Sequence, residues 1–498
     1  MSRPHPRNIH GEISGEIRGL GRFPNITHCW WPCATAAGHR NRLVAVLLAA
    51  LACACEQPSP DLPQNVVLIL VDTLRADHLS SYGYERVTSP RLDAFGADNI
   101  RFARVRSQSA CTSPSVSSLL TSRSPLALMD QPQGHLGIPR RMPSLAEILK
   151  GFGFWTIAIS SSPIVRKTPS EANRFGEFDR GFDIFDEECL MEDARCVNQK
   201  TLAILDTITP PFFLYLHYMD VHAPYAPPPD FERPFSKPHD GHILVTAGRP
   251  QQFQEEARNL GFAIEPESVA HFVDRYDDEI AFFDRELGQL FDELAKRALW
   301  ERSIVIVASD HGDAFMEQGY LGHCRVPLFE GMISTPLIMA IPGVGRTEAI
   351  RDETQNLDIV PTIIDYLGHD PTEYGFEGRS LRSLINGDET VARFGFAIQG
   401  LELIASDRDF SLSYDLDSQA TRMFDRARDP SYERDLADSH PERKAALLGE
   451  VERQLGLAGA GPRSGIAARA RRLEDELRAL GYLIEPSAEP ARGPSASP

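Results

Sequence analysis

Continuous apolar runs alternate with amphipathic stretches through the central part of the chain, and this alternation predicts the fold. The run at 65–71 is rich in Val, Leu and Ile, which is typical of a strand buried on both faces of a parallel sheet. Further strands are predicted at 155–160, 212–218, 303–309 and 335–341, and helices at 144–150, 276–297 and 359–367. The pattern favours the α/β class, an αβα sandwich with a mostly parallel central sheet covered on both sides by helices.

The pattern changes after about residue 388, where shorter strands come before two helices. Strands are predicted at 394–399, 410–414 and 422–424, and helices at 442–455 and 466–480. This order indicates a small C-terminal α+β subdomain. The predicted organisation is a leader at 1–55, a tether at 56–64, a large domain at 65–387, the subdomain at 388–484 and a disordered tail at 485–498. A polar insertion at 231–270 is either a lid near the site or a peripheral excursion.

Polar clusters follow three of the predicted strands directly. Asp72 follows the first, the segment 219–222 follows the third, and Asp310-His311-Gly312-Asp313 follows the fourth. Ligands of open parallel sheets gather at the carboxyl ends of the strands. We therefore expect these side chains to share one site.

The Ser/Thr-rich stretch 110–122 indicates a loop that turns into a helix. Ser113 is the predicted N-cap and Pro114 the first helical residue, which places Thr112 just ahead of the helix N-terminus. Free N–H groups and the helix dipole favour an anion at that point. A metal-activated hydroxyl there is a candidate nucleophile, and an ordinary cap in a polar loop is the alternative.

The candidate metal ligands combine oxygen atoms with one imidazole. They are Asp72, Thr112, Asp310 and His311. An imidazole among oxygens favours Zn²⁺ or Mn²⁺ for a single divalent site, with Ca²⁺ or Mg²⁺ as further options. A second ion would use Asp220, His222 or His323.

Two histidines and two arginines are candidates for contact with an anionic ester substrate. The candidate catalytic residues are Thr112, His222 and His323. The two histidines can offer a hydrogen bond or a positive charge to a tetrahedral anion and its leaving group. Arg123 and Arg325 are candidate substrate-binding residues, with surface roles as the alternative. The formal net charge of −19 argues against non-specific nucleic-acid binding.

The N-terminal region resembles an export signal. The apolar run at 43–55 follows Arg40 and Arg42, is short for a membrane span and suits the core of a signal peptide. Cys53 or Cys55 is then the lipidated residue of an exported, periplasmic or membrane-anchored lipoprotein. A buried helix of a cytosolic protein is the alternative.

Four further cysteines bear on whether the protein is exported. Cys189 and Cys196 are close enough in sequence to form a small disulfide loop, which an exported protein permits. Cys111 and Cys324 each adjoin a candidate site residue, and their pairing stays open at this point.

Several motifs resemble the sulfatase family of the alkaline-phosphatase superfamily. The opening motif is the segment 71–84, Val-Asp-Thr-Leu-Arg-Ala-Asp-His-Leu-Ser-Ser-Tyr-Gly-Tyr, and the segments 213–225 and 308–313 also match. Shorter matches occur at 276–280, 358–362 and 378–381. The resemblance covers about residues 65–455 and implies an α/β/α sulfatase-like catalytic domain, a smaller C-terminal subdomain and a metal-bound nucleophile.

The chain departs from the family pattern at the nucleophile. Sulfatases that form formylglycine carry Cys-x-Pro-x-Arg, but here Thr112 holds the Cys place and Val116 the Arg place. Cys111 lies one residue too early, and threonine cannot become formylglycine, so no formylglycine is expected.

The neighbouring family positions differ as well. Thr73 replaces a common second Asp, His311 replaces the Asn of calcium-dependent sulfatases, and His323 stands near the place of a Lys. These changes resemble the phospho-transferring branches, which include phosphoglycerol and phosphoethanolamine transferases and phosphodiesterases.

The leading hypothesis is a metal-dependent hydrolase or transferase that cleaves a phosphate or phosphonate ester through a covalent Thr112 intermediate. A threonine ester must be released by water or an alcohol acceptor, which suits phosphoryl transfer. The alternatives are a sulfuric ester hydrolase that uses Thr112 directly and an inactive binding protein on the same fold.

Overall fold

The structure is a computed structural model that describes residues 62–128, 137–170, 173, 176–237, 249–389, 392–457 and 463–479. The predicted leader with Cys53 and Cys55, nearly all of the tether and the C-terminal tail lie outside these residues. Among the described helices, none combines the length and apolar character needed to cross a membrane.

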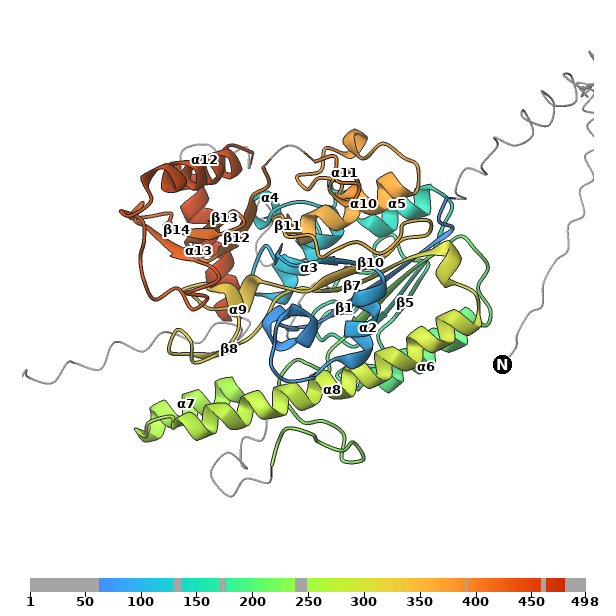
Figure 1. The fold of residues 1–498 in the computed structure, drawn as a ribbon, viewed down its shortest axis with the longest axis horizontal. Helices are drawn as coiled ribbons and strands as arrows, with labels where there is room; N and C mark the ends of the chain where they lie inside the picture. The colour runs from blue at the N-terminus through green and yellow to red at the C-terminus, as the bar shows by residue number, and fades with distance from the viewer. Residues whose placement is uncertain are drawn as a thin grey trace, which may run out of the picture. The chain divides into compact units, whose positions relative to one another are not determined.

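A seven-stranded sheet forms the centre of the fold (Figure 1). Its order is β2 (Ile100–Phe102), β10 (Leu337–Ala340), β7 (Ser303–Ser309), β1 (Asn65–Val71), β6 (Phe212–Tyr218), β4 (Trp155–Ser160) and β5 (Ile184–Asp186). The five strands from β7 to β5 are parallel, and β10 runs antiparallel to both of its neighbours. The predicted mostly parallel sheet is confirmed.

Helices cover both faces of this sheet. Alternate residues of β1 point to opposite faces, so Val67 and Ile69 enter one apolar core while Val66 and Leu68 enter the other. The first core is completed by α2 (Pro90–Asp98), α6 (Ala194–Leu205) and α8 (Pro266–Lys296). The second is completed by α3 (Thr112–Thr121), α5 (Leu145–Gly151) and α10 (Ile359–Tyr366). The αβα sandwich is therefore confirmed (Figure 1).

The described part of the predicted insertion contains a helix and the start of α8. Helix α7 spans Pro250–Leu260, and α8 begins at Pro266 rather than at 276, because a proline in the first turn suits a helix start. Gln254 of α7 accepts a hydrogen bond from the Leu321 backbone N–H (3.0 Å) and donates one to the Gly319 carbonyl (2.9 Å). The insertion thus packs on the hairpin that leads to His323.

A four-stranded antiparallel sheet forms the C-terminal part of the fold. Its strands are β12 (Gly395–Gln399), β13 (Glu402–Ser406), β14 (Phe410–Asp415) and β15 (Thr421–Asp425), and its apolar residues pack against α12 (Pro441–Leu457) and α13 (Arg463–Ala479). Strand β13 is absent from the sequence-based expectation. The Ile398 N–H donates to the Gln108 carbonyl (2.9 Å), so this sheet lies beside the segment that precedes Thr112.

The remaining described elements are short. They are α4 (Pro125–Leu128), α9 (Glu330–Ile333), α11 (Arg382–Ile385), β3 (Val105–Arg106), β8 (Ala314–Phe315), β9 (Leu321–Gly322), β11 (Thr354–Gln355) and the 3-10 turns at Ala76–His78, Ser80–Tyr82, Trp300–Arg302, Asn356–Asp358 and Pro371–Tyr374.

Candidate active site

Helix α3 begins at the candidate nucleophile itself. Cys111 holds the N-cap position with extended backbone (φ −129°, ψ 139°) and gives no side-chain cap, and Thr112 is the first helical residue. The prediction that Ser113 caps this helix and that Pro114 opens it is therefore wrong. Cys111 is fixed in this conformation from outside the helix, by its disulfide to Cys324 and by the hydrogen bond from the Cys324 N–H to the Ala110 carbonyl (2.9 Å).

The structure brings the four candidate metal ligands together. One ligand atom each of Asp72, Asp310 and His311 lies within 4.8 Å of the others, and all three residues are buried. The Thr112 hydroxyl lies 3.5 Å from Asp72 Oδ2 and 3.2 Å from His311 Nε2. Asp72 and Asp310 follow adjacent parallel strands, β1 and β7, which explains why residues so distant in sequence meet.

The two carboxylates have the surroundings of a cation site. Asp72 Oδ1 and Asp310 Oδ2 are buried and accept no hydrogen bond from the described residues. Burial and the neighbouring charge of Asp72 raise the pKa of Asp310 well above its ordinary value. Two adjacent buried carboxylates with free oxygens are costly unless a cation neutralises them, so the donor set fits a divalent metal.

His217 positions one of these carboxylates and is a residue that sequence reasoning did not assign to the site. It lies inside β6, where its Nε2 is 3.2 Å from Asp72 Oδ2 and its Nδ1 is 2.9 Å from the Tyr215 hydroxyl. A carboxylate only accepts, so Nε2 carries the hydrogen and Tyr215 donates to Nδ1. Burial raises the pKa of Asp72, but this hydrogen bond and the charges of His222 and His311 outweigh burial and hold that pKa well below its ordinary value.

The two candidate catalytic histidines lie next to the cluster. The ring of His323 is 4.8 Å from that of His311 and 5.0 Å from that of His222, centroid to centroid. His323 Nδ1 lies 3.2 Å from Asp313 Oδ1, and the Tyr225 hydroxyl donates to the other oxygen of Asp313. Asp313 is thus a second positioning residue that the sequence-based assignment left out.

The two histidines have opposite pKa shifts. Burial alone lowers the pKa of His323, but the charge of Asp313 and the hydrogen bond to it raise this pKa above its ordinary value. Burial lowers the pKa of His222, whose Nδ1 lies 2.5 Å from the Ala223 carbonyl oxygen. His323 therefore favours its protonated form, whereas His222 favours its neutral form.

The structure does not bring Arg123 or Arg325 to the cluster. Arg123 follows the far end of α3 and donates to the Tyr374 carbonyl (3.0 Å). The Arg325 guanidinium lies 6.0 Å from the centre of the Tyr320 ring, and burial and the charge of Arg258 lower its pKa. Among the described contacts, neither arginine bonds to a residue of the cluster.

Asp220 has a structural partner. Its Oδ1 accepts a hydrogen bond from the Ala194 N–H (2.8 Å) at the start of α6, and burial raises its pKa to about 7. The group of described residues whose ligand atoms converge consists of Asp72, Asp310 and His311, without Asp220.

Both cysteine pairs of the described region form disulfides. Cys189 and Cys196 close the small loop that the sequence predicted. Cys111 and Cys324 also pair, with Cα atoms 4.8 Å apart. This second bond joins the residue before Thr112 to the residue after His323, so it holds the candidate nucleophile and a candidate catalytic histidine in one unit.

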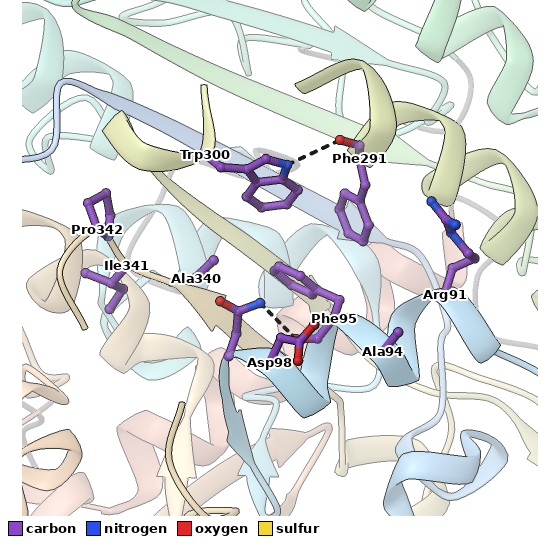
Figure 2. Close-up of a pocket in the computed structure, with 10 residues that line it drawn as sticks. Arg91, Ala94, Phe95, Asp98, Phe291, Trp300, Ala340, Ile341 and Pro342 are labelled. Atoms are coloured by element: carbon purple, nitrogen blue, oxygen red, sulfur yellow. Dashed lines mark hydrogen bonds between the residues drawn. The ribbon is translucent and has the colours of Figure 1, made fainter. Parts of the chain in front are cut away.

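An aromatic cavity of about 450 Å³ lies elsewhere in the molecule, between α2, the end of α8 and the end of β10 (Figure 2). Phe95, Phe291 and Trp300 form its apolar wall, and Trp300 Nε1 donates to the Phe291 carbonyl (3.3 Å). None of the candidate site residues lines this cavity.

Comparison with known proteins identifies the family. The profile of the sulfatase family matches residues 64–369. The chain is 31% identical to a choline-sulfatase of Rhizobium meliloti over 130 residues, which cover 26% of this chain and 25% of that protein. It is 23% identical to an arylsulfatase of Hemicentrotus pulcherrimus over 362 residues, which cover 68% of this chain and 65% of that protein.

A solved structure shows the same fold. The phosphonate monoester hydrolase of Agrobacterium radiobacter superposes with a TM-score of 0.61 at 20% identity and covers 80% of this chain and 95% of its own. The family match spans more than half of the chain, so this protein belongs to the sulfatase family.

Proposed function

We propose that the protein is a metal-dependent hydrolase or transferase that cleaves a phosphate or phosphonate ester through a covalent Thr112 intermediate. The observation that carries this proposal is the position of the Thr112 hydroxyl, 3.2 Å from His311 Nε2 and 3.5 Å from Asp72 Oδ2 at the N-terminus of α3. Cys111, the cysteine nearest to the family's formylglycine place, is engaged in a disulfide. A threonine nucleophile therefore takes the place of formylglycine.

Asp72, Asp310 and His311, together with Thr112, would hold one divalent cation, with Zn²⁺ or Mn²⁺ favoured by the single imidazole. Such a cation lowers the pKa of a neighbouring hydroxyl and stabilises charge on the ester oxygens. The two free carboxylate oxygens, Asp72 Oδ1 and Asp310 Oδ2, support this assignment.

In this proposal, the reaction consists of two successive displacements at phosphorus. Thr112 Oγ1 loses its proton and forms a bond to phosphorus while the bond from phosphorus to the leaving oxygen breaks, and one proton in total passes from the Thr112 hydroxyl to the departing alcohol. Water or an acceptor alcohol next attacks the phosphothreonine, the Thr112 oxygen leaves, and the hydroxyl regains its proton. Because His323 Nδ1 faces Asp313, its Nε2 is the atom available to hydrogen-bond the substrate or leaving group. The N–H groups at the start of α3 favour the anionic ester.

The test is a panel of aryl phosphate monoesters, phosphodiesters, phosphonate monoesters and sulfate esters, assayed with zinc or manganese supplied. We expect turnover of a phospho ester and a loss of about 10⁴-fold or more in Thr112→Ala. Thr121→Ala is the matched control, because Thr121 lies at the other end of the same helix and bonds the Ser117 carbonyl. Full activity of Thr112→Ala would overturn the proposal.

A sulfuric ester hydrolase that uses Thr112 is the second candidate, and the sulfatase relatives favour it. The same panel separates the two, because cleavage of sulfate esters alone would exclude the phospho-ester activity. A protein that binds no metal and cleaves no ester would instead be a binding protein on this fold.

We also propose that the protein is exported and anchored by a lipid on Cys53 or Cys55. The disulfides Cys111–Cys324 and Cys189–Cys196 support an oxidising compartment, because such bonds persist mainly in exported proteins. Metabolic labelling with a fatty acid tests the anchor. We expect the label to disappear in the Cys53→Ser/Cys55→Ser protein, and label that persists there would contradict the proposal.

A further inference from the structure

The β2–β10 edge of the central sheet carries four arginines that lack a carboxylate partner. They are Arg101, Arg104, Arg346 and Arg351, named here the arginine groove. None of them takes part in an ion pair within the described part of the chain, whereas the nearby Arg75 and Arg426 each pair with carboxylates. Four unpaired guanidinium groups in one region are unusual in a chain of net charge −19.

These arginines line two adjoining cavities. One, of about 510 Å³, is lined by Arg101, Arg346 and Arg351 among others. The second, of about 470 Å³, is lined by Arg101, Arg104 and Arg351 and extends to Arg426. Because Arg101 and Arg351 contribute to both, the two cavities lie side by side.

The backbone that carries the arginines is held in place by hydrogen bonds. The Ile350 N–H donates to the Arg101 carbonyl (2.9 Å), and the Ala103 N–H donates to the Ile350 carbonyl (2.7 Å). The Thr354 N–H donates to the Arg104 carbonyl (3.0 Å). The Arg101 guanidinium also lies 5.2 Å from the centre of the Tyr82 ring, within cation–π range. The backbone beneath the groove and the Arg101 side chain are therefore held in place before any ligand arrives.

The acidic residues of the two cavities mostly have partners of their own. Asp77 pairs with Arg75, and Glu330 pairs with Arg106 and Arg426. Asp93 accepts hydrogen bonds from Ser80 and from the Ser81 N–H, but these neutral donors leave its charge in place, so it offsets one of the four arginines. Glu348 is the remaining acidic lining residue and is exposed.

The groove thus retains uncompensated positive charge. Burial and the nearby charge of Arg426 lower the pKa of Arg104 and outweigh the opposite effect of Glu353 and Asp409, so an anion bound here would stabilise the Arg104 charge. Planar guanidinium groups donate paired hydrogen bonds to phosphate and sulfate oxygens.

We infer that the arginine groove binds an oligoanion that carries at least two phosphate or sulfate groups. None of Asp72, Thr112, Asp310 and His311 lines either cavity, so the groove is a separate site. The inference is independent of the proposed catalytic role of Thr112.

Isothermal titration of the metal-free protein in low-salt buffer tests the inference, with inorganic tripolyphosphate and a sulfated tetrasaccharide as the two probes. We expect at least one probe to bind and Arg101→Ala/Arg351→Ala to weaken it about tenfold or more. The probe that binds identifies the source of the anionic groups. Arg346→Ala, at an exposed position, provides a second variant with a smaller expected loss if the double variant does not fold.

The control is Arg302→Ala/Arg422→Ala, which removes the same charge from two exposed arginines outside the groove. We expect this variant to bind the probe within about twofold of the unchanged protein. Equal weakening in the control, or no binding of either probe to the unchanged protein, would overturn the inference.

Discussion

Two buried charged clusters of this protein differ in how their carboxylate oxygens are satisfied. The first consists of Glu330, Glu353, Arg106 and Arg426, and it joins α9 and the β3–β11 pair to the end of β15 in the C-terminal sheet. Glu330 Oε1 accepts from Arg106 (2.8 Å) and Arg426 (2.9 Å), and its Oε2 lies 3.2 Å from Arg426 Nη2. Glu353 Oε1 accepts from Ser406 (2.8 Å), and its Oε2 accepts from Arg426. Every carboxylate oxygen of this cluster has a donor.

The second cluster consists of Asp72, Asp310 and His311, and it has one free oxygen on each carboxylate. It is equally buried, but no described residue donates to Asp72 Oδ1 or Asp310 Oδ2. Burial and charge alone therefore do not mark a functional site. A satisfied cluster stabilises the fold, whereas an unsatisfied one keeps its free electron pairs for a cation.

Asp310→Asn breaks the unsatisfied cluster and has the largest expected effect. Loss of a charged ligand should lower kcat/KM by about 10³-fold or more. The free energy of unfolding of the metal-free protein should not fall, because the substitution removes a buried charge that is repelled by Asp72. Ester assays and urea titration measure the two quantities. Asp98→Asn, at an exposed position, is the control, and strong destabilisation by Asp310→Asn would contradict the assignment.

Glu330→Gln breaks the satisfied cluster and should act on stability instead. It leaves two buried guanidinium groups without their shared charge, so we expect a loss of about 3–5 kcal/mol in the free energy of unfolding. Urea denaturation measures this loss. The fall in kcat/KM should be much smaller for Glu330→Gln than for Asp310→Asn. A larger loss of kcat/KM in Glu330→Gln, with a larger loss of stability in Asp310→Asn, would contradict the distinction between the two clusters.

The Glu330 carboxylate should make the free energy of unfolding depend on pH. Burial raises the pKa of Glu330, but the charges of Arg106 and Arg426 outweigh burial and hold it well below its ordinary value of 4.5. Its stabilising contribution is therefore complete above about pH 4.5 and is lost as the pH falls below that value. The difference in Tm between the unchanged protein and Glu330→Gln should shrink between about pH 5 and about pH 3. A Tm difference that stays constant over this pH range would contradict the lowered pKa of Glu330.

His217→Gln changes a neighbour of the unsatisfied cluster and has the smallest expected effect of these substitutions. His217 donates to Asp72 without belonging to the ligand set, so its loss should lower metal affinity or turnover by about 10–100-fold. Metal titration and ester assays measure both. Tyr215→Phe, which removes only the hydroxyl that donates to His217, should have a smaller effect. Unchanged metal affinity and turnover in His217→Gln would exclude a positioning role.

The fold was largely predictable because strands buried on both faces appear as unbroken apolar runs. β1, β4, β6 and β7 begin and end at the predicted residues. Strand β13 was missed because it has polar residues, Glu402 and Ser406, at its two ends. The predicted start of α3 was wrong because Cys111 is the N-cap of this helix. A disulfide to Cys324, which is distant in sequence, holds Cys111 in that position.

The candidate site was predictable where its residues follow strands. Asp72, Asp310 and His311 lie together because parallel strands deliver their ends to one edge. His217 was missed because it lies within an apolar strand and resembles an ordinary interior position. The prediction that Arg123 and Arg325 hold the anion was not reliable, because a sequence does not show on which side of a helix or hairpin a long side chain lies.

Peptide mapping of the enzyme, quenched in acid during turnover of an aryl phosphate or phosphonate ester, detects a covalent intermediate on the nucleophile. We expect a phosphoryl or phosphonyl group on Thr112, formed with the metal present and absent in Asp310→Asn. A covalent group on another residue, or steady turnover with Thr112 unmodified at every quench time, would contradict it.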